Sequence, residues 1–300
     1  MPTVASNSIA DPNPVRAMLS MLLAVGLFSL MDAGLKLLTA HYPPLQIAAL
    51  RGLSSLPWVL AWAATTVGLR SLLRVRWPLH LLRGVIGVGM MVGFVFGLRT
   101  LPLSTAYSIT FVAPLLITAL AVPILHEQVG PRRWFAVVVG LIGVVVVLRP
   151  GTGGLVSLGG LAVLLAAFAY AASAITVRVL ARTDSNQSMV VWLMGMVGLG
   201  AAAFAAPHWQ AVRSEDWLVI LGIGIVGALA QIAITDAFRR GQASLIAPLE
   251  YTALAWGVGL DLLLWHVLPD AITWIGAAII VVSGLYLLRR ERVHAEAEHP

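Results

Sequence analysis

Long apolar runs alternate along the chain with short clusters of arginine, proline or polar residues. An apolar run of about 20 residues is long enough to cross a bilayer as a helix. Helices are predicted for the runs 17–40, 45–66, 79–98, 103–125, 132–149, 156–180, 188–206, 217–238, 243–265 and 272–289. The connections between them are short and contain helix-stopping prolines, so successive helices are expected to be antiparallel.

The amino-acid composition supports membrane-spanning helices and argues against a soluble protein. Hydrophobic residues make up 59% of the 300-residue chain and charged residues 11%, whereas soluble domains carry roughly 25% charged residues. Ten spans and their connections leave no room for a soluble domain. The first run, 17–40, is too long for a signal-peptide core and contains Asp32 and Lys36, so it is predicted to be a retained helix.

The net charge of +6 is distributed as membrane topology requires, not as a nucleic-acid surface. With a cytoplasmic N-terminus, fourteen arginines including Arg83 fall on the predicted inner side, and only Arg99, Arg149 and Arg213 on the outer side. Because cytoplasmic loops carry the basic excess, both termini are expected in the cytoplasm of a multi-pass protein of the bacterial inner membrane.

An ungapped shift of 140 residues aligns the two halves of the chain. His126 then meets His266, Trp134 meets Trp274, and Arg149 meets Arg289. Each half contains five predicted helices, and because five is odd, the second half must enter the membrane from the opposite side. The expected domains are an N-terminal tail (1–15), two five-helix repeats (16–150 and 151–290) and a C-terminal tail (291–300).

Five charged residues inside the spans are candidates for function. Lys36, the only lysine, follows Asp32 by four residues on one helix face, so the two are expected to form a charge pair that engages substrate, relays protons or simply holds the bundle together. Glu250 and Asp261 are eleven residues apart in the ninth span and are predicted to share a face, with simple solvation as an equal reading for Asp261. Pro114 and Pro248 are expected to break the fourth and ninth spans. Arg51 could bind an anion or extend to the headgroups.

Uncharged residues extend the candidate set. Gln231 is a plausible cavity-lining amide in the eighth helix. Aromatic and methionine side chains more often serve packing, but as a group they would admit an aromatic or apolar substrate. The candidates are Met91, Phe94, Tyr107, Tyr170 and Tyr251.

Several motifs argue against enzymatic chemistry. Gly222-x-Gly224-x-x-Gly227 matches a dinucleotide fingerprint as text, but it lies inside an apolar run with no preceding strand. His126-Glu127 lacks the second histidine of a zinc-protease motif, because position 130 is Gly130. The chain has no cysteine. No catalytic residue, metal or cofactor is therefore expected.

The chain resembles the drug/metabolite transporter superfamily, and specifically its ten-helix EamA type. The resemblance is carried by the stretch from Leu98 to Pro114, by His126-Glu-Gln-Val-Gly-Pro-Arg-Arg-Trp134, and by Gly140-x-x-Gly143 followed by Arg149-Pro-Gly151. The second half departs from the pattern at His266-Val267. Within the superfamily the chain looks most like the bacterial aromatic amino-acid exporters.

The resemblance implies a fold and a function. The fold is an all-α integral membrane protein with ten transmembrane helices in two inverted five-helix repeats around a central cavity. The function is export of amino acids, aromatic ones preferred, by a monomer in contact with lipid that needs no protein partner and binds no nucleic acid. The cavity would be lined by Lys36, Met91, Phe94, Tyr107, Tyr170, Gln231, Glu250 and Tyr251. Export of a drug or nucleotide sugar, or an intramembrane enzyme, are the alternatives.

Overall fold

The computed structural model describes residues 14–125, 130–148, 157–180, 183–240 and 247–298. Within these ranges the chain forms helices and connecting turns, without β-strands. In order they are α1 (Pro14–Leu38), α2 (Pro44–Thr66), η1 (Leu69–Leu73), α3 (Trp77–Leu98), α4 (Leu103–Thr110), α5 (Ala113–Leu125), α6 (Pro131–Leu148), α7 (Leu158–Leu180), α8 (Asn186–Ala205), η2 (Ala206–His208), η3 (Ser214–Asp216), α9 (Trp217–Arg240), η4 (Ala247–Thr252), α11 (Ala253–Trp265) and α12 (Ala271–Glu298).

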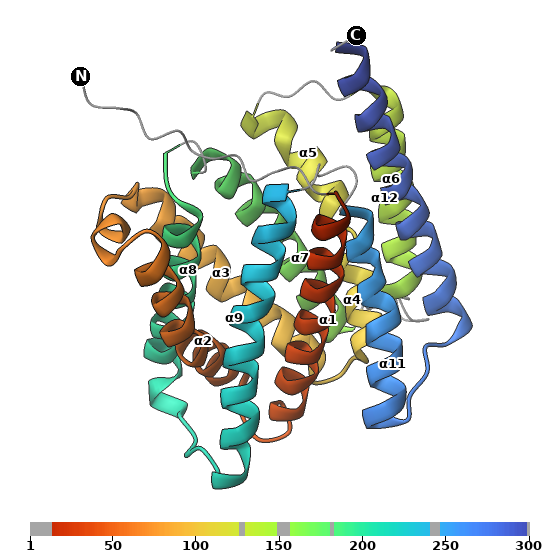
Figure 1. The fold of residues 1–300 in the computed structure, drawn as a ribbon. Helices are drawn as coiled ribbons and strands as arrows, with labels where there is room; N and C mark the ends of the chain where they lie inside the picture. The colour runs from red at the N-terminus through yellow and green to blue at the C-terminus, as the bar shows by residue number, and fades with distance from the viewer. Residues whose placement is uncertain (1–13, 126–129, 149–156, 181–182, 241–246, 299–300) are drawn as a thin grey trace, which may run out of the picture.

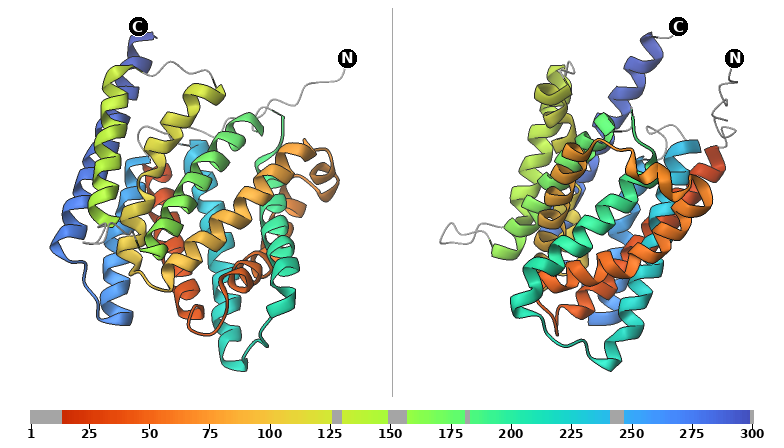
Figure 2. Two further views of the ribbon diagram at one scale, coloured as in Figure 1. Left: turned by 180° about the vertical axis from the view of Figure 1, so that it is seen from behind. Right: turned by 90° about the vertical axis from the view of Figure 1, so that its left-hand side faces the viewer.

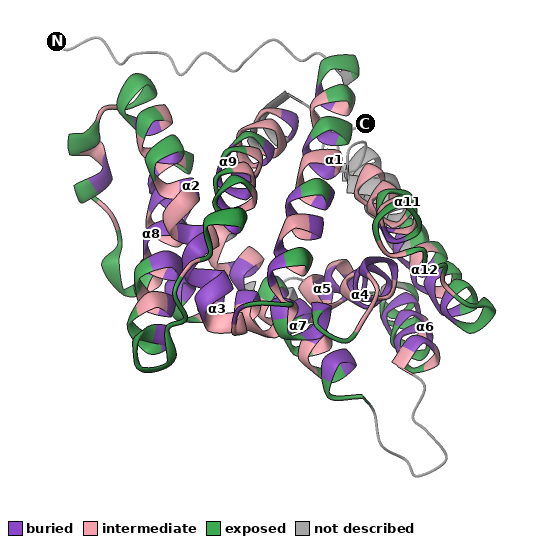
Figure 3. Ribbon diagram, turned by 90° about the horizontal axis from the view of Figure 1, so that it is seen from below, coloured by how far each residue is buried: buried purple, intermediate pink, exposed green. Residues whose placement is uncertain are grey.

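The predicted membrane spans are present. Seven segments of the described chain are long and apolar enough to cross a membrane, including α4 and α5 taken together, and α6 and α12 contain shorter apolar helices. The η4–α11 segment completes ten. Large apolar side chains such as Val85, Phe204, Leu218 and Leu263 are at least 70% exposed, which suits a surface that faces lipid. Figure 3 shows exposed positions on the outward sides of α8 and α12.

Contacts between helices follow the inverted repeat. The two repeats correspond helix by helix: in order, α1, α2, α3, α4–α5 and α6 of the first match α7, α8, α9, η4–α11 and α12 of the second. In this correspondence the contact of α1 with α9 mirrors the contact of α7 with α3. The contact of α5 with α7 mirrors that of α11 with α1. The pairs α2–α8 and α6–α12 map onto themselves, and they lie at opposite edges of the bundle (Figure 1 and Figure 2). The structure is therefore two five-helix repeats of inverted orientation.

Both self-symmetric pairs cross at glycines. A Cβ atom on Gly52 of α2 would collide with the backbone of Gly198 of α8, and one on Gly276 of α12 would lie 2.9 Å from the carbonyl oxygen of Gly143 of α6. The absence of a side chain lets the helix backbones approach closely, as in other membrane-helix interfaces.

A polar contact joins the repeats at each end of the bundle. At the end where α1 begins and α12 ends, which we call the terminal face, Asp184 of the α7–α8 loop lies 2.8 Å from His80 Nε2 of α3. At the opposite end, the distal face, Asp216 accepts a 2.6 Å hydrogen bond from Tyr42 of the α1–α2 loop. Each contact joins the loop of one repeat to the start of the third helix of the other.

The fourth span is broken where the sequence predicts. Pro114 has no backbone N–H and its ring clashes with the carbonyl group four residues earlier, and α4 ends at that residue, Thr110. The ninth span begins as the 3-10 helix η4, which contains Pro248, before α11 starts at Ala253.

Some sequence predictions concern residues outside the described ranges. The N-terminal tail falls mostly there, as do the boundary between the halves at 150 and 151 and the motif residues His126 and Glu127. At the other end, α12 continues to Glu298, so most of the segment predicted as a C-terminal tail is helical.

Candidate functional site

A buried ion pair joins the two repeats at the distal face. Lys36 Nζ, in the last turn of α1, lies 3.3 Å from Asp261 Oδ1 of α11. Lys36 Nζ also donates to the carbonyl oxygen of Leu101 at 3.0 Å and lies 4.4 Å from the ring centroid of Trp265. The side chain of Asp261 is 0% exposed, so its charge depends on these partners.

Asp261 also holds the beginning of α4. It accepts hydrogen bonds from the backbone N–H groups of Leu103 and Ser104, at 2.9 and 2.8 Å, and from the hydroxyl of Ser104 at 2.7 Å. The first N–H groups of a helix have no partner within it and favour a negative charge. Asp261 therefore connects α1, α4 and α11 at one point, and we call Lys36, Asp261 and Ser104 the distal lock.

The distal lock corrects three sequence predictions. Lys36 pairs with Asp261 and not with Asp32, because the tertiary fold brings α11 to the end of α1. Asp261 is buried, not solvated. Glu250 lies in the 3-10 helix η4 and Asp261 in α11, so the eleven-residue separation between them does not consist of the three α-helical turns on which a shared face was predicted.

Asp32 forms a second group with aromatic residues of the first repeat. Its Oδ2 accepts a 2.9 Å hydrogen bond from the hydroxyl of Tyr107 on α4. The ring of Tyr107 stacks on Phe94 of α3, with centroids 6.5 Å apart and an interplanar angle of 14°. Arg51 of α2 is close enough to interact electrostatically with Asp32. Four helices thus contribute one residue each to this group.

Glu250 gathers a third group from both repeats. It is half-buried in η4 and interacts electrostatically with Tyr170 of α7 and with the neighbouring Tyr251. Tyr170 also interacts with Arg83 of α3. The ring of Tyr251 meets Phe111, at the α4–α5 break, edge to face at 5.1 Å. The two broken spans therefore face each other through aromatic rings.

Two further predicted residues are uncharged side chains on α3 and α9. Met91 is 5% exposed and packs in the main hydrophobic core. Gln231 is half-buried on α9.

Sequence reasoning assigned Arg83 to the inner surface, but the structure buries it in α3, where it donates to the carbonyl of Met189 at 2.8 Å. The burial of Arg83 could have been predicted from its position within the apolar run 79–98. Arg51 is likewise part of the interior and does not extend to the headgroups.

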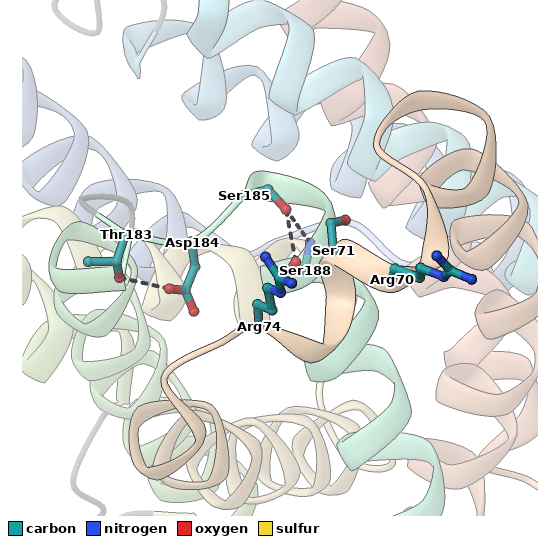
Figure 4. A pocket seen from close by; sticks show the side chains of 7 residues that line it. All are labelled: Arg70, Ser71, Arg74, Thr183, Asp184, Ser185 and Ser188. Carbon is teal, nitrogen blue, oxygen red and sulfur yellow. Dashed lines mark hydrogen bonds between the residues drawn. The ribbon is translucent and has the colours of Figure 1, made fainter. Parts of the chain in front are cut away.

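A surface pocket of the described chain lies elsewhere. It has a volume of about 500 Å³ and lies at the terminal face between η1 and the start of α8 (Figure 4). Its lining residues are Arg70, Ser71, Arg74, Thr183, Asp184, Ser185 and Ser188. None of the predicted substrate residues is among them. Because it lies at the surface, away from the broken spans, we do not assign it to the substrate pathway.

The family model and three relatives that match this chain are named as transporters. The model of the EamA-like transporter family matches residues 15–149 and 157–289. A riboflavin transporter of Vibrio cholerae is 31% identical, over 78% of this chain and 79% of its own. The pseudopaline exporter of Pseudomonas aeruginosa is 25% identical over 88% and 93%. An S-adenosylmethionine uptake transporter of Rickettsia prowazekii is 28% identical over 73% and 74%.

The fold is shared with a protein of known structure. A solved crystal structure matches with a TM-score of 0.65 and 22% identity, covering 93% of this chain and 99% of its own. The family model matches each half of the chain separately, as expected for the repeat seen in the helix contacts. The chain belongs to the EamA-like transporter family.

Proposed function

We propose that this protein exports amino acids, with a preference for aromatic ones, across the bacterial inner membrane by alternating access. The observation that carries the proposal is that each of two carboxylates interacts with a tyrosine of a broken span, Asp32 with Tyr107 of α4 and Glu250 with Tyr251 of η4. Carboxylates attract an ammonium group, and aromatic rings favour an aromatic side chain. The proposed orientation places both termini, and hence the terminal face, in the cytoplasm.

The relatives support small-molecule transport as the general function. They are named for transport of riboflavin, pseudopaline and S-adenosylmethionine. Export as the direction is supported by the pseudopaline exporter, which matches 88% of the chain. Uptake transporters are also among the relatives, so the direction must be measured.

In the proposed cycle the distal lock closes the outer end while the site is loaded from the cytoplasm. Opening outward requires α1 and α11 to separate, which breaks the contact between Lys36 and Asp261. Breaking a buried pair leaves charge in a medium of low dielectric constant, so the lock favours the closed outer end until substrate binding stabilises the alternative. Asp32 and Glu250 are the groups that would carry protons if export is coupled to a proton gradient.

A second candidate substrate class is a larger heteroaromatic metabolite. The 31% identity to a riboflavin transporter favours it, and the same aromatic rings could stack on a fused ring system.

The test is counterflow in proteoliposomes that contain only this protein, comparing radiolabelled Trp and Phe with Leu, Ala and riboflavin. The proposal predicts saturable flux of Trp and Phe well above that of Leu and Ala. Equal flux of all four amino acids would contradict the aromatic preference, and flux of riboflavin alone would favour the second candidate. A pH gradient imposed in the same assay reports whether protons are coupled.

A further inference from the structure

Arg51 has unused hydrogen-bonding capacity inside the protein. It lies two turns into α2, and its Nη1 donates to the sulfur of Met194 on α8, at 3.7 Å, while its Nε is buried without a hydrogen-bond partner in the described chain. Buried guanidinium groups normally bind carboxylate or carbonyl oxygens. An unsatisfied N–H group at this position indicates that a partner comes from outside the chain.

Asp32 of α1 is an acidic residue that interacts with this guanidinium. The two charges interact electrostatically, yet they form no ion pair within the part of the chain that the structure describes. Tyr107 donates to Oδ2 of Asp32, and no described residue donates to Oδ1. A cation and an anion on two helices in contact, α2 and α1, therefore each keep a free hydrogen-bonding position in the described chain.

Two other polar side-chain atoms in the described chain are buried without a hydrogen-bond partner. They are the hydroxyls of Ser29 and Tyr251. Ser29 precedes Asp32 by three residues, on the same side of α1, and lies near Tyr107. Tyr251 contacts Phe111 of the α4–α5 break. Ser29 therefore lies beside the Asp32 group, whereas the hydroxyl of Tyr251 lies against Gly284 of α12.

We propose that Arg51 and Asp32 form a zwitterion site, in which Arg51 binds the α-carboxylate of an amino acid and Asp32 binds its α-ammonium group. The planar guanidinium can donate two parallel hydrogen bonds to a carboxylate. The substrate side chain then lies toward the stacked rings of Phe94 and Tyr107. This inference rests on the proposed function and names the groups that recognise the amino-acid backbone.

The test measures binding of three related ligands by titration calorimetry on the full chain in detergent. Trp carries both charges, tryptamine lacks the carboxylate, and indole-3-propionate lacks the ammonium group. Arg51→Gln should weaken Trp binding about 10- to 100-fold, as expected for loss of a charge-assisted contact, and leave tryptamine binding unchanged. Asp32→Asn should weaken Trp binding and spare indole-3-propionate. Arg51→Lys should retain part of the affinity for Trp.

Arg99→Gln is the matched control, because Arg99 is an exposed arginine at the end of α3. It should bind all three ligands as the unmodified protein does. Equal Trp affinity in Arg51→Gln and the unmodified protein would overturn the zwitterion site, as would an equal loss of Trp and tryptamine. Failure of the unmodified protein to bind Trp would instead contradict the proposed function.

Discussion

Lys36 and Asp261 are 225 positions apart in the chain, yet their side chains form a buried pair at the distal face. Removing one partner of such a pair typically costs about 3–5 kcal/mol, because the other charge stays buried and uncompensated. In a protein with two conformations this cost falls on the conformation that contains the pair. Single substitutions at the distal lock should therefore shift the balance between conformations.

Asp261→Asn and Lys36→Met should each open the distal face. The chain has no native cysteine, so spin labels can be attached specifically at Ala40→Cys and Leu268→Cys, two exposed positions after α1 and α11. Double electron–electron resonance should show an additional population with a longer distance between the two spin labels in both lock variants. Glu215→Gln, at an exposed distal residue, should leave the distances unchanged. Identical distributions in all variants would contradict a lock.

Asp184 should make stability depend on pH. Burial raises the pKa of Asp184, but hydrogen bonds from Thr183, His80 and the backbone N–H of Arg76 outweigh it and hold the pKa below its ordinary value of 3.8. The stabilisation from a carboxylate with a lowered pKa is complete above the unfolded-state pKa, and it is lost as the pH falls through the folded-state pKa.

Asp184→Asn should therefore lower the free energy of unfolding at pH 7 by about 1–3 kcal/mol. The difference from the unmodified protein should shrink below pH 3.8, where the native carboxylate also becomes neutral. Thermal unfolding in detergent at a series of pH values measures this. A difference that is constant with pH would show that the contribution does not come from the charge of Asp184.

At the scale of the elements, the break between α4 and α5 is set by one residue. Pro114→Ala restores a backbone N–H and removes the clash with Thr110, so α4 and α5 should join into one helix. This would displace Phe111 from Tyr251. Trp flux should fall at least about tenfold, while thermal stability should stay the same or rise, because a proline inside a helix costs about 3 kcal/mol.

Pro123→Ala is the control for this experiment, because Pro123 lies within α5, away from the break. It should leave flux unchanged. Full activity of Pro114→Ala would show that transport does not need the broken span.

The elements were the most predictable part of the molecule. Span positions follow from hydropathy because the bilayer fixes helix length, and the break at Thr110 follows from the chemistry of Pro114. Partners of charged side chains were not predictable in the same way. Asp32 is one turn from Lys36 in the sequence, but the contact that forms depends on where α11 packs, and the 3-10 turn of η4 altered the phase assumed between Glu250 and Asp261.

At the scale of the molecule, the inverted repeat could be derived from the 140-residue shift, and the family model and mirrored helix contacts agree with it. The contacts between repeats needed the structure. His80 and Asp184, 104 positions apart, show no sequence pattern that links them. The contacts between the repeats at the ends of the bundle could therefore be identified only from the structure.

Alternating access requires that the distal face open during each cycle. The double variant Ala40→Cys/Leu268→Cys can be closed by a flexible bifunctional thiol reagent with a cleavable disulfide, and Trp counterflow can be measured before crosslinking, after it and after cleavage. Alternating access predicts flux that is lost on crosslinking and restored by cleavage, with no effect of the reagent on either single variant. Undiminished flux through the crosslinked protein would contradict transport by opening of the distal face.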